Sequence, residues 1–246
     1  MTFDPFGDFA TRGYLRNVAR QKDLTIVRQM EHSSFTTGLE EAFAQLNACT
    51  TIRYEDVLST HEVLFEAVYP SWAGQDRLAT TPKLVITKGT GDDKIIFAYP
   101  QDINRAVAFA LTRGQDKAYM AAHPGDVMGY LAHGHPFLDG NGRTIMTVHC
   151  VLAHRAGISI DWASTTKSDY LAALSLELED PGKGHLDAYL KPFIRKGIDP
   201  DTFVANVGGA PGLDGENEDT VLGNTEDPRL KAEYEAQELK RKEAKP

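Results

Sequence analysis

Apolar residues recur every three or four positions along most of this chain, and this spacing places them on one face of an α-helix. The pattern extends over 23–46 and 54–68, resumes after Pro100 and near Pro124, and returns in three later stretches, 144–157, 167–179 and 186–196. A chain patterned in this way buries its apolar faces between helices. We therefore expect a mainly α fold.

One stretch departs from the helical pattern. Residues 84–87 read LVIT, residues 95–99 read IIFAY, and the connection between them contains the turn-forming run KGTGDD. Two β-branched runs around a glycine-containing connection are typical of a β-hairpin. The sequence thus predicts helices around a single hairpin at 84–99.

Composition and charge exclude several classes of protein. Of the 246 residues, 41% are hydrophobic, which is enough for a sizeable core, and no apolar run approaches the roughly 18 residues of a membrane span. The first residues are acidic where a secretory signal would be basic, so we expect a cytoplasmic protein with no membrane partner. The net charge of −9 argues against nucleic acid as a partner, because a phosphate backbone attracts basic surfaces.

Four regions follow from these patterns. Residues 1–49 are expected to form an N-terminal helical segment, and 50–207 the core domain. Residues 208–228 are expected to be an acidic flexible linker, because 211–228 contain six acidic and no basic residues together with several glycines and prolines. The charged tail, 229–246, mixes six basic with four acidic residues at spacings compatible with a solvent-exposed helix.

The chemistry is concentrated in residues 135–143, which read HPFLDGNGR. Gly140 and Gly142 allow backbone conformations and a close approach that a side chain would block, and Arg143 opens the next helix. Backbone N–H groups at a helix N-terminus carry partial positive charge and attract anions. A phosphate bound there would be held by the loop amides, by Asn141 and by the guanidinium of Arg143.

Two further side chains of this loop suit the chemistry of a bound phosphate. Asp139 supplies a carboxylate, the kind of oxygen ligand that Mg²⁺ prefers when it bridges phosphate oxygens. His135 lies four residues earlier, and histidine is the side chain best suited to accept a proton at neutral pH. The residues alone thus predict a phosphate-binding loop with a metal ligand and a general base.

The loop resembles the signature of a known family. Residues 135–143 satisfy nine consecutive positions of the pattern HPFx[D/E]GNGRxxR, which marks the Fic (filamentation induced by cAMP) family. Two flanking stretches, THEVLFEAVYPSWAGQDR at 60–77 and AGISIDW at 156–162, are similar to family segments before and after the motif helix. The resemblance covers roughly 50–195 and implies a Fic-type helical bundle with one β-hairpin, the flap, at 84–99.

The resemblance implies a protein adenylyltransferase that moves AMP from its co-substrate ATP onto a Ser, Thr or Tyr hydroxyl of a target protein. In that interpretation His135 is the general base that deprotonates the hydroxyl, and Asp139 holds Mg²⁺. The α-phosphate and, at the distal end, the remaining phosphates are held by Gly140, Asn141, Gly142 and Arg143. Phe137 anchors the loop in the core.

The flap is the second feature to which the resemblance assigns a function. An unpaired strand edge binds an extended peptide through main-chain hydrogen bonds, so we expect one edge of the flap to align a segment of the target protein. The flap residues concerned are Leu84, Val85, Ile86, Ile95, Ile96 and Phe97. Just before the flap, Trp72 is expected to pack beneath it, whereas Arg77 can either pack there or line the nucleotide pocket.

One position departs from the family pattern. Met146 stands three residues after Arg143, where the family has a second arginine, on the helix face that Arg143 shares. In many relatives a glutamate from a [S/T]xxxE[G/N] helix pairs with that second arginine and obstructs the nucleotide. The nearest match here is 36–40, followed by Glu41, so Glu40 is the candidate inhibitory residue, with an ordinary exposed glutamate as the alternative. A regulatory or antitoxin partner is a further expectation.

Several alternatives stay open at this point. Family members also transfer UMP, phosphate or phosphocholine through the same loop, and Met146 makes a non-catalytic nucleotide-binding module a candidate. A metal hydrolase built on His123, His133 and His135 is disfavoured, because zinc requires several converging ligands. The remaining helical histidines, expected to pack or to lie at the surface, are His61, His149 and His154.

Overall fold

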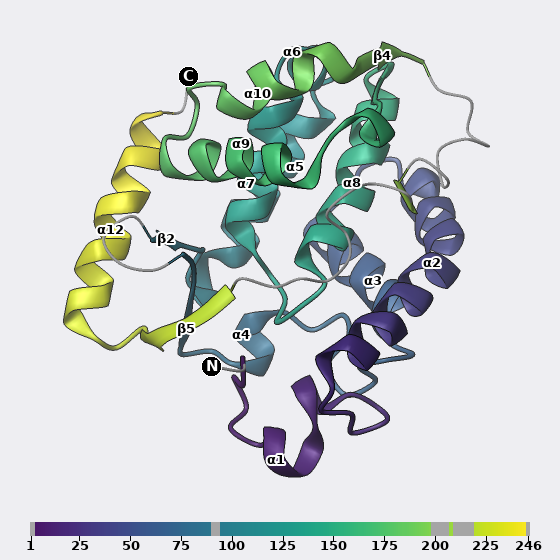
Figure 1. Ribbon diagram of the computed structural model, residues 1–246. Helices are drawn as coiled ribbons and strands as arrows, with labels where there is room; N and C mark the ends of the chain where they lie inside the picture. The colour runs from purple at the N-terminus through teal and green to yellow at the C-terminus, as the bar shows by residue number, and fades with distance from the viewer. Residues whose placement is uncertain (1–2, 90–93, 198–206, 209–218, 245–246) are drawn as a thin grey trace.

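The computed structural model describes residues 3–89, 94–197, 207–208 and 219–244, without the side chains of 219–222 (Figure 1). Its centre is a helical bundle made of α2 (Leu24–Ala48), α3 (Tyr54–Phe65), α5 (Ile103–Gln115), α7 (Pro124–Gly134) and α8 (Asn141–Arg155). Helix α8 contacts each of the other four, so it is the middle of the bundle. The mainly α fold predicted from the apolar spacing is confirmed.

Shorter elements surround this bundle. Helices α9 (Lys167–Glu179) and α10 (His185–Leu190) pack on α7, and α6 (Lys117–Ala122) packs against α5, α7 and α8. The N-terminal part holds α1 (Phe9–Arg12) and the 3₁₀ turn η1 (Tyr14–Arg16), and α4 (Arg77–Thr80) precedes the hairpin. The remaining short elements are η3 (Pro100–Asp102), η4 (Trp162–Ser164), η5 (Lys191–Phe193) and the antiparallel pair β3 (Ile158–Ile160) and β4 (Ile194–Lys196).

Local chemistry sets the helix ends that matter for the site. Asp23 caps α2 by accepting a hydrogen bond of 2.9 Å from the Thr25 amide, and Pro124 occupies the first turn of α7, where no amide hydrogen is required. Gly140 has a φ of 75° just before α8, and an added Cβ there would lie 2.6 Å from the Phe65 ring. Glycine is therefore required at 140 both for the backbone conformation and for the close packing.

The core of the bundle is one continuous apolar cluster. The inner faces of α2 and α3 contribute side chains that are at most 1% exposed: Phe35, Leu39, Leu46, Val57, Leu64 and Phe65. The same cluster includes Phe137, which is fully buried and so anchors the loop at 135–143 in the core. No helix within the described ranges combines the length and the apolar composition that crossing a membrane requires.

The predicted hairpin is present, and it carries a third strand. β1 (Leu84–Lys88) pairs antiparallel with β2 (Ile95–Ile96), with Thr87 opposite Ile96. On its other side β1 pairs antiparallel with β5 (Asp219–Asn224), so that the strand order is β2-β1-β5. The hairpin is thus the middle and one edge of a small sheet.

The predicted flexible linker at 208–228 is wrong for its second half, 219–228, which the structure describes. Residues 219–224 form β5, and helix α12 begins at Pro228. The stretch 209–218 lies outside the described residues. An acidic composition indicates that a segment favours solvent, but it does not show whether a neighbouring strand is available. Here the edge of β1 is available, and the segment pairs with it.

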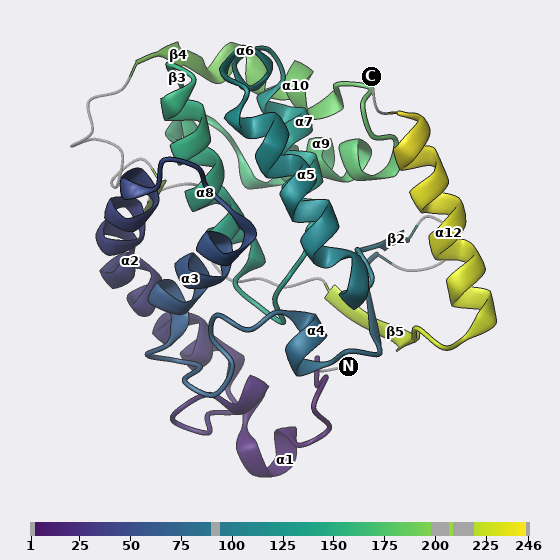
Figure 2. The same cartoon turned by 180° about the vertical axis from the view of Figure 1, so that it is seen from behind.

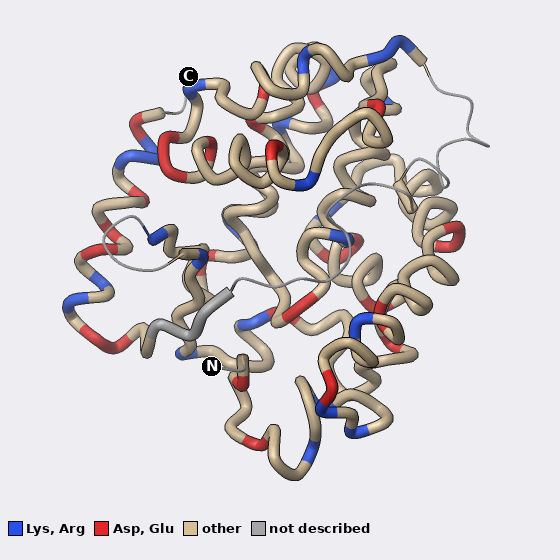
Figure 3. The backbone as a smooth tube through the Cα atoms, in the orientation of Figure 1, with Lys and Arg blue, Asp and Glu red and all other residues tan. Residues whose placement is uncertain are grey.

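The C-terminal helix α12 (Pro228–Glu243) lies next to the hairpin, on the opposite side of the molecule from α2 (Figures 1 and 2). A helix forms here as the spacing predicts, and both basic and acidic residues lie along it (Figure 3). It is not solvent-exposed all round, because one face buries Leu230, Tyr234, Glu238 and Arg241. The two apolar members of this face form a cluster with Val85, Ile96 and Tyr99.

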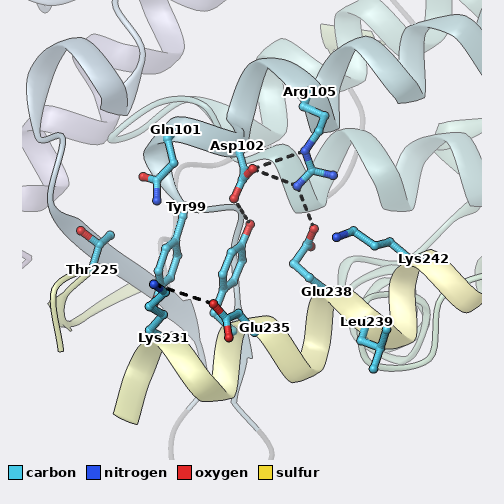
Figure 4. Close-up of a pocket in the computed structure, with 11 residues that line it drawn as sticks. Tyr99, Gln101, Asp102, Arg105, Thr225, Lys231, Glu235, Glu238, Leu239 and Lys242 are labelled. Carbon is cyan, nitrogen blue, oxygen red and sulfur yellow. Dashed lines mark hydrogen bonds and ion pairs between the residues drawn. The ribbon is translucent and has the colours of Figure 1, made fainter. Parts of the chain in front are cut away.

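Polar contacts fix α12 to the bundle. Arg105 on α5 bridges Asp102 and Glu238, at 2.9 and 3.1 Å, and these three side chains line a pocket between α5 and α12 (Figure 4). Glu238 is also 2.8 Å from Nε2 of His133, and the Tyr234 hydroxyl donates to Asp102 at 2.9 Å. The C-terminal helix is thus tied to the last turn of α7, from which the candidate active loop starts.

Candidate active site

The loop between α7 and α8 has a strained start. His135 has a φ of 39° and a ψ of 58°, in the left-handed region, which costs a residue with a side chain on the order of 1–3 kcal/mol. Such a conformation persists only where the surrounding contacts over-determine the backbone. Asn141, His61 and Arg77 supply such contacts to the loop.

Asn141 closes the loop on itself. Its Oδ1 accepts a hydrogen bond of 2.9 Å from the Phe137 amide, and its Nδ2 donates to the Phe137 carbonyl at 2.8 Å and to His135 Nε2 at 3.1 Å. Both hydrogens of the side-chain amide are therefore used inside the loop. The sequence suggested a phosphate donor at this position, whereas in this structure the side chain orients His135.

His135 is placed as a proton acceptor. Because Asn141 donates to Nε2, the neutral imidazole carries its proton on Nδ1 and its lone pair on Nε2. The ring stacks on Phe97 of the flap, with centroids 3.8 Å apart and an interplanar angle of 10°. The candidate base and the flap are thus in direct contact.

Asp139 lies in a buried polar cluster on the same loop. Its Oδ2 accepts from the Tyr14 hydroxyl at 3.0 Å, and its Oδ1 accepts from the Gly140 amide at 2.6 Å. Burial, and next the negative charge of Glu31, raise the pKa of Asp139 to about 7, against the opposing charge of Arg143. Within the described residues no group of three His, Cys, Asp or Glu side chains could hold a metal by itself, so this single carboxylate fits a Mg²⁺ held mainly by phosphates and water.

Arg143, in the first turn of α8, is held by a glutamate that the sequence analysis missed. Its Nη2 forms an ion pair of 2.9 Å with Glu31 and lies 3.5 Å from Asp139. Glu31 is 1% exposed and also accepts a hydrogen bond from the Tyr69 hydroxyl. The other terminal nitrogen, Nη1, is buried and has no hydrogen-bond partner among the described residues. One edge of the guanidinium is therefore fixed by the protein, and the other is unsatisfied.

The sequence of α2 contains a pattern that could have identified Glu31 as a buried residue. The buried residues of this helix at four-residue spacing are Val27, Glu31, Phe35 and Leu39, and Glu31 is the charged one among them. Glu40, the predicted inhibitory residue, lies nine positions after Glu31, which is about 180° around a helix that turns about 100° per residue. Glu40 is exposed, and its inhibitory role stays a prediction. The glutamate of α2 that reaches Arg143 comes from the buried face.

His61 supports the loop from α3. Its Nδ1 accepts from the Gly74 amide at 3.0 Å, so its Nε2 carries the proton and donates to the Asp139 carbonyl at 3.1 Å. The ring stacks on Phe137 with centroids 3.7 Å apart. Burial lowers the pKa of His61 to about 3, so the ring is neutral at physiological pH. The expected packing residue thus also holds the loop by hydrogen bonds.

Trp72 and Arg77 have different roles in the structure. Trp72 is 2% exposed and donates from Nε1 to the Leu15 carbonyl at 2.8 Å, so it is a packing residue of the core. Arg77 is fully buried, and its Nε donates to the His135 carbonyl at 2.8 Å while its Nη2 donates to the Ala98 carbonyl at 2.7 Å. Arg77 therefore contacts the loop and the end of the flap at the same time.

Both edges of the flap are covered, contrary to the predicted unpaired edge. The outer edge of β1 pairs with β5. At the outer edge of β2, the Gln237 side chain of α12 accepts from the Ile96 amide at 3.1 Å and donates to the Lys94 carbonyl at 3.2 Å. Gln237 thus satisfies this edge as the main chain of an added strand would. Most predicted flap side chains, Val85, Ile86, Ile95, Ile96 and Phe97, are at most 5% exposed, and Leu84 is half-buried.

Three other predicted positions have distinct environments. An added Cβ at Gly142 would meet no described atom within 4 Å, so there is room over the first turn of α8. Met146 is 1% exposed and belongs to the apolar core. His133, weighed above as a metal ligand together with His135, instead bonds Glu238 of α12.

The chain is similar in sequence to known proteins. The family model described as Fic/DOC matches residues 51–153. The chain is 29% identical over 170 residues to "Protein adenylyltransferase VbhT" of Bartonella schoenbuchensis, a match that covers 69% of this chain and 35% of that protein. It is 27% identical over 169 residues to "Probable protein adenylyltransferase y4lH" of Sinorhizobium fredii, covering 65% of this chain and 81% of that protein. The chain thus spans about a third of the length of the Bartonella relative.

Solved structures show the same fold. The BepC protein of Bartonella tribocorum, crystallised with AMPPNP, superposes with a TM-score of 0.55 at 17% identity, over 74% of this chain and 92% of that chain. An N-terminal Fic domain from Bartonella quintana, crystallised with ADP, superposes with a TM-score of 0.53 at 19% identity, over 69% and 86%. Residues 51–153 contain the loop, the flap and His61 with Arg77, which support the loop. Residues 51–153 of the chain thus match the Fic/DOC family, and the chain shares its fold with a solved Fic domain.

Proposed function

We propose that this chain is a protein adenylyltransferase, which transfers AMP from Mg-ATP to a Ser, Thr or Tyr hydroxyl of a target protein. One observation carries the proposal: a single loop presents the lone pair of His135 Nε2, the carboxylate of Asp139 and the unsatisfied Nη1 of Arg143. A base, a hard oxygen ligand and an anion donor are the groups that nucleotidyl transfer to a hydroxyl requires.

The phosphates of the nucleotide would lie over the first turn of α8. Gly142 leaves room there, and the amides of the helix N-terminus are directed toward an anion at that point. Arg143 would donate from Nη1 while Glu31 keeps hold of Nη2. Asp139 would hold Mg²⁺, which when bound neutralises phosphate charge.

The transfer itself needs one proton acceptor. The target hydroxyl oxygen attacks the α-phosphorus, its proton passes to Nε2 of His135, and the bond from the α-phosphorus to the bridging oxygen breaks to release pyrophosphate. Asn141 must give up its bond to Nε2 as the hydroxyl approaches, because one lone pair cannot accept two donors. Asn141 then has a free N–H, which can turn to the phosphate as the sequence suggests.

The relatives support the nucleotide and the group transferred. Two of them are named protein adenylyltransferases, and two similar Fic structures contain AMPPNP or ADP. The proposal extends to a target segment that replaces Gln237 at the edge of β2, to a regulatory or antitoxin partner, and to a cytoplasmic location, where ATP is available.

A second candidate is the transfer of another group, such as UMP, phosphate or phosphocholine, through the same loop. It is favoured by Met146, which leaves the helix face next to Arg143 without a second guanidinium for the distal phosphates. Incubation of a cell lysate with the protein and ATP labelled at the α- or the γ-phosphate separates these functions. Label from the α-position alone supports AMP transfer, and label from the γ-position alone supports phosphate transfer. No His135-dependent label from either would contradict the proposed function.

A further inference from the structure

We propose that Arg77 is a positioning residue, which holds His135 in place and couples it to the end of the flap. The proposal rests on the proposed function in taking His135 as the base, whereas the contacts themselves do not depend on it. Arg77 opens α4 and is fully buried. A buried arginine requires partners for its donors, so those partners indicate what it holds.

Three donors of Arg77 bind main-chain carbonyls. Its amide donates to Pro136 at 2.7 Å, its Nε to His135 at 2.8 Å and its Nη2 to Ala98 at 2.7 Å. Two of these carbonyls belong to the loop, and the third directly follows Phe97 of the flap. A guanidinium is a rigid planar fork, so the carbonyls that it binds are held at a fixed separation. Arg77 therefore fixes the end of the flap relative to the loop.

The same two segments make two further contacts. The Phe97 ring stacks on the His135 ring, and the Ala98 amide donates to the His133 carbonyl at 3.0 Å. A ring stack, a main-chain hydrogen bond and the Arg77 bridge thus join 97–98 to 133–135. A displacement of the flap end is transmitted to the base through these contacts.

The backbone of His135 needs such a support. Its left-handed conformation is unfavourable for a residue with a side chain and persists only while its neighbours impose it. The bonds from Arg77 to the carbonyls of His135 and Pro136 orient two successive peptide planes at this point. Arg77 therefore acts on the reaction through His135 and not by touching the reacting atoms.

Two substitutions of Arg77 and one control test the proposal. Arg77→Lys keeps the charge but replaces the planar fork, whose Nε and Nη2 bind the two carbonyls from separate atoms, with one ammonium group on a flexible stem, which does not fix the separation of those carbonyls. Arg77→Met removes the side-chain donors altogether. Arg155→Met is the matched control, because Nη2 of Arg155 also donates to two main-chain carbonyls, those of Leu46 and Cys49, each at 2.6 Å. These partners lie at the end of α2 and not in the loop.

The first readout is the NMR signal of the carbon-bound ring protons of His135, assigned by their loss in His135→Gln. Stacking on the face of Phe97 shifts these protons upfield. We expect the upfield shift to be largely lost in Arg77→Lys and Arg77→Met and to be unchanged in Arg155→Met. A folded Arg77→Lys protein that keeps the wild-type shift would overturn the proposal.

The second readout is AMP transfer. A displacement of about 1 Å at the reacting group costs about 10²-fold in rate, so we expect kcat to fall by about that factor in Arg77→Lys while ATP affinity stays close to that of wild type. A role limited to stability would lower the melting temperature of the Arg77 and Arg155 variants alike and leave the His135 protons in place, which contradicts the proposal. If the wild-type protein transfers no AMP, the proposed function fails, and the NMR readout alone decides the role of Arg77.

Discussion

The loop at 135–143 and the flap at 84–99 lie against each other, but they are held in different ways. The loop is fixed by Asn141 within it and by His61 from the neighbouring α3. The flap is covered on its outer edges by the end of the chain, and the residue that binds Ile96 follows it by 141 positions.

This difference separates a fixed chemical centre from an edge that can exchange partners. The contacts that Asn141 and His61 make with the loop are buried and come from the loop and from α3, so they do not involve the outer edges of the flap. The edge of β2 is satisfied by a single side chain, Gln237, which a peptide main chain can replace with the same donors and acceptors. A fixed base next to a replaceable edge suits an enzyme that modifies extended segments of other proteins.

The largest effect on activity is expected at the candidate base of the loop. His135→Ala should lower the rate of AMP transfer by about 10²- to 10⁴-fold, because general-base catalysis contributes that much. ATP binding, measured by calorimetry, should be largely retained, since Arg143 and the N-terminus of α8 are unchanged. His32→Ala, at an exposed histidine of α2, is the control. Near-normal transfer by the His135 variant would remove this residue as the base.

The second prediction tests how the anion donor is held. Glu31→Ala leaves Arg143 buried and without its ion pair, and breaking such a pair costs about 3–5 kcal/mol. We expect the free energy of unfolding, measured with urea, to fall by that amount. Glu40→Ala, on the exposed face of the same helix, should change it by less than about 0.5 kcal/mol. An equal fall in the free energy of unfolding for the two variants would contradict the buried ion pair of Glu31 with Arg143.

The sequence predicts the loop better than its surroundings, for a physical reason. Residues 135–143 and the hairpin are local patterns, so spacing and residue type are sufficient to find them. The ion pair of Glu31 with Arg143 joins positions 112 apart, and spacing within α2 shows only that Glu31 is buried. The segment of β5 is predicted as a linker because its composition does not reveal that it pairs with β1, which lies far away in the sequence.

The same limit applies to single side chains. Asn141 is correctly placed in the loop, but a sequence does not show that both of its amide hydrogens bind inside the loop. Arg77 is found as part of a motif, and only the structure shows that it bridges two segments. Residue identity is thus readable from the chain, whereas the direction in which a side chain donates is not.

The third prediction concerns the tie between α12 and α7. Burial lowers the pKa of His133 to about 4, below its unfolded value of about 6.5. The unfolded chain therefore takes up a proton first as the pH falls, so the contribution of neutral His133 is full above about pH 6.5 and is lost as the pH falls toward 4. We expect a loss on the order of 2–3 kcal/mol over this window. Glu238 acts at lower pH: burial raises its pKa, but the hydrogen bond from His133 and other contacts outweigh this and lower it to about 2.

His133→Gln tests this sign. Glutamine can still donate to Glu238 but does not titrate, so unfolding with urea at about pH 7 and at about pH 5 should show a smaller loss for the variant than for the wild type. Equal losses in the two proteins would show that another group causes the pH dependence. The difference between the two proteins measures how firmly the C-terminal segment is attached next to the loop.

The smallest expected effect is on the flap side. Gln237→Ala removes two hydrogen bonds at a sheet edge, where water can replace them, so the free energy of unfolding should fall by only about 1 kcal/mol.

If the edge of β2 is where a target segment binds, the same variant should lower the KM for the target while kcat and ATP affinity stay unchanged. Ile96→Pro removes the main-chain donor from the strand itself and should raise that KM. Glu235→Ala, exposed on α12, is the control. Opposite shifts in KM from the two variants identify the edge as the docking site, whereas a rise in both means that Gln237 only supports the hairpin and that targets bind elsewhere.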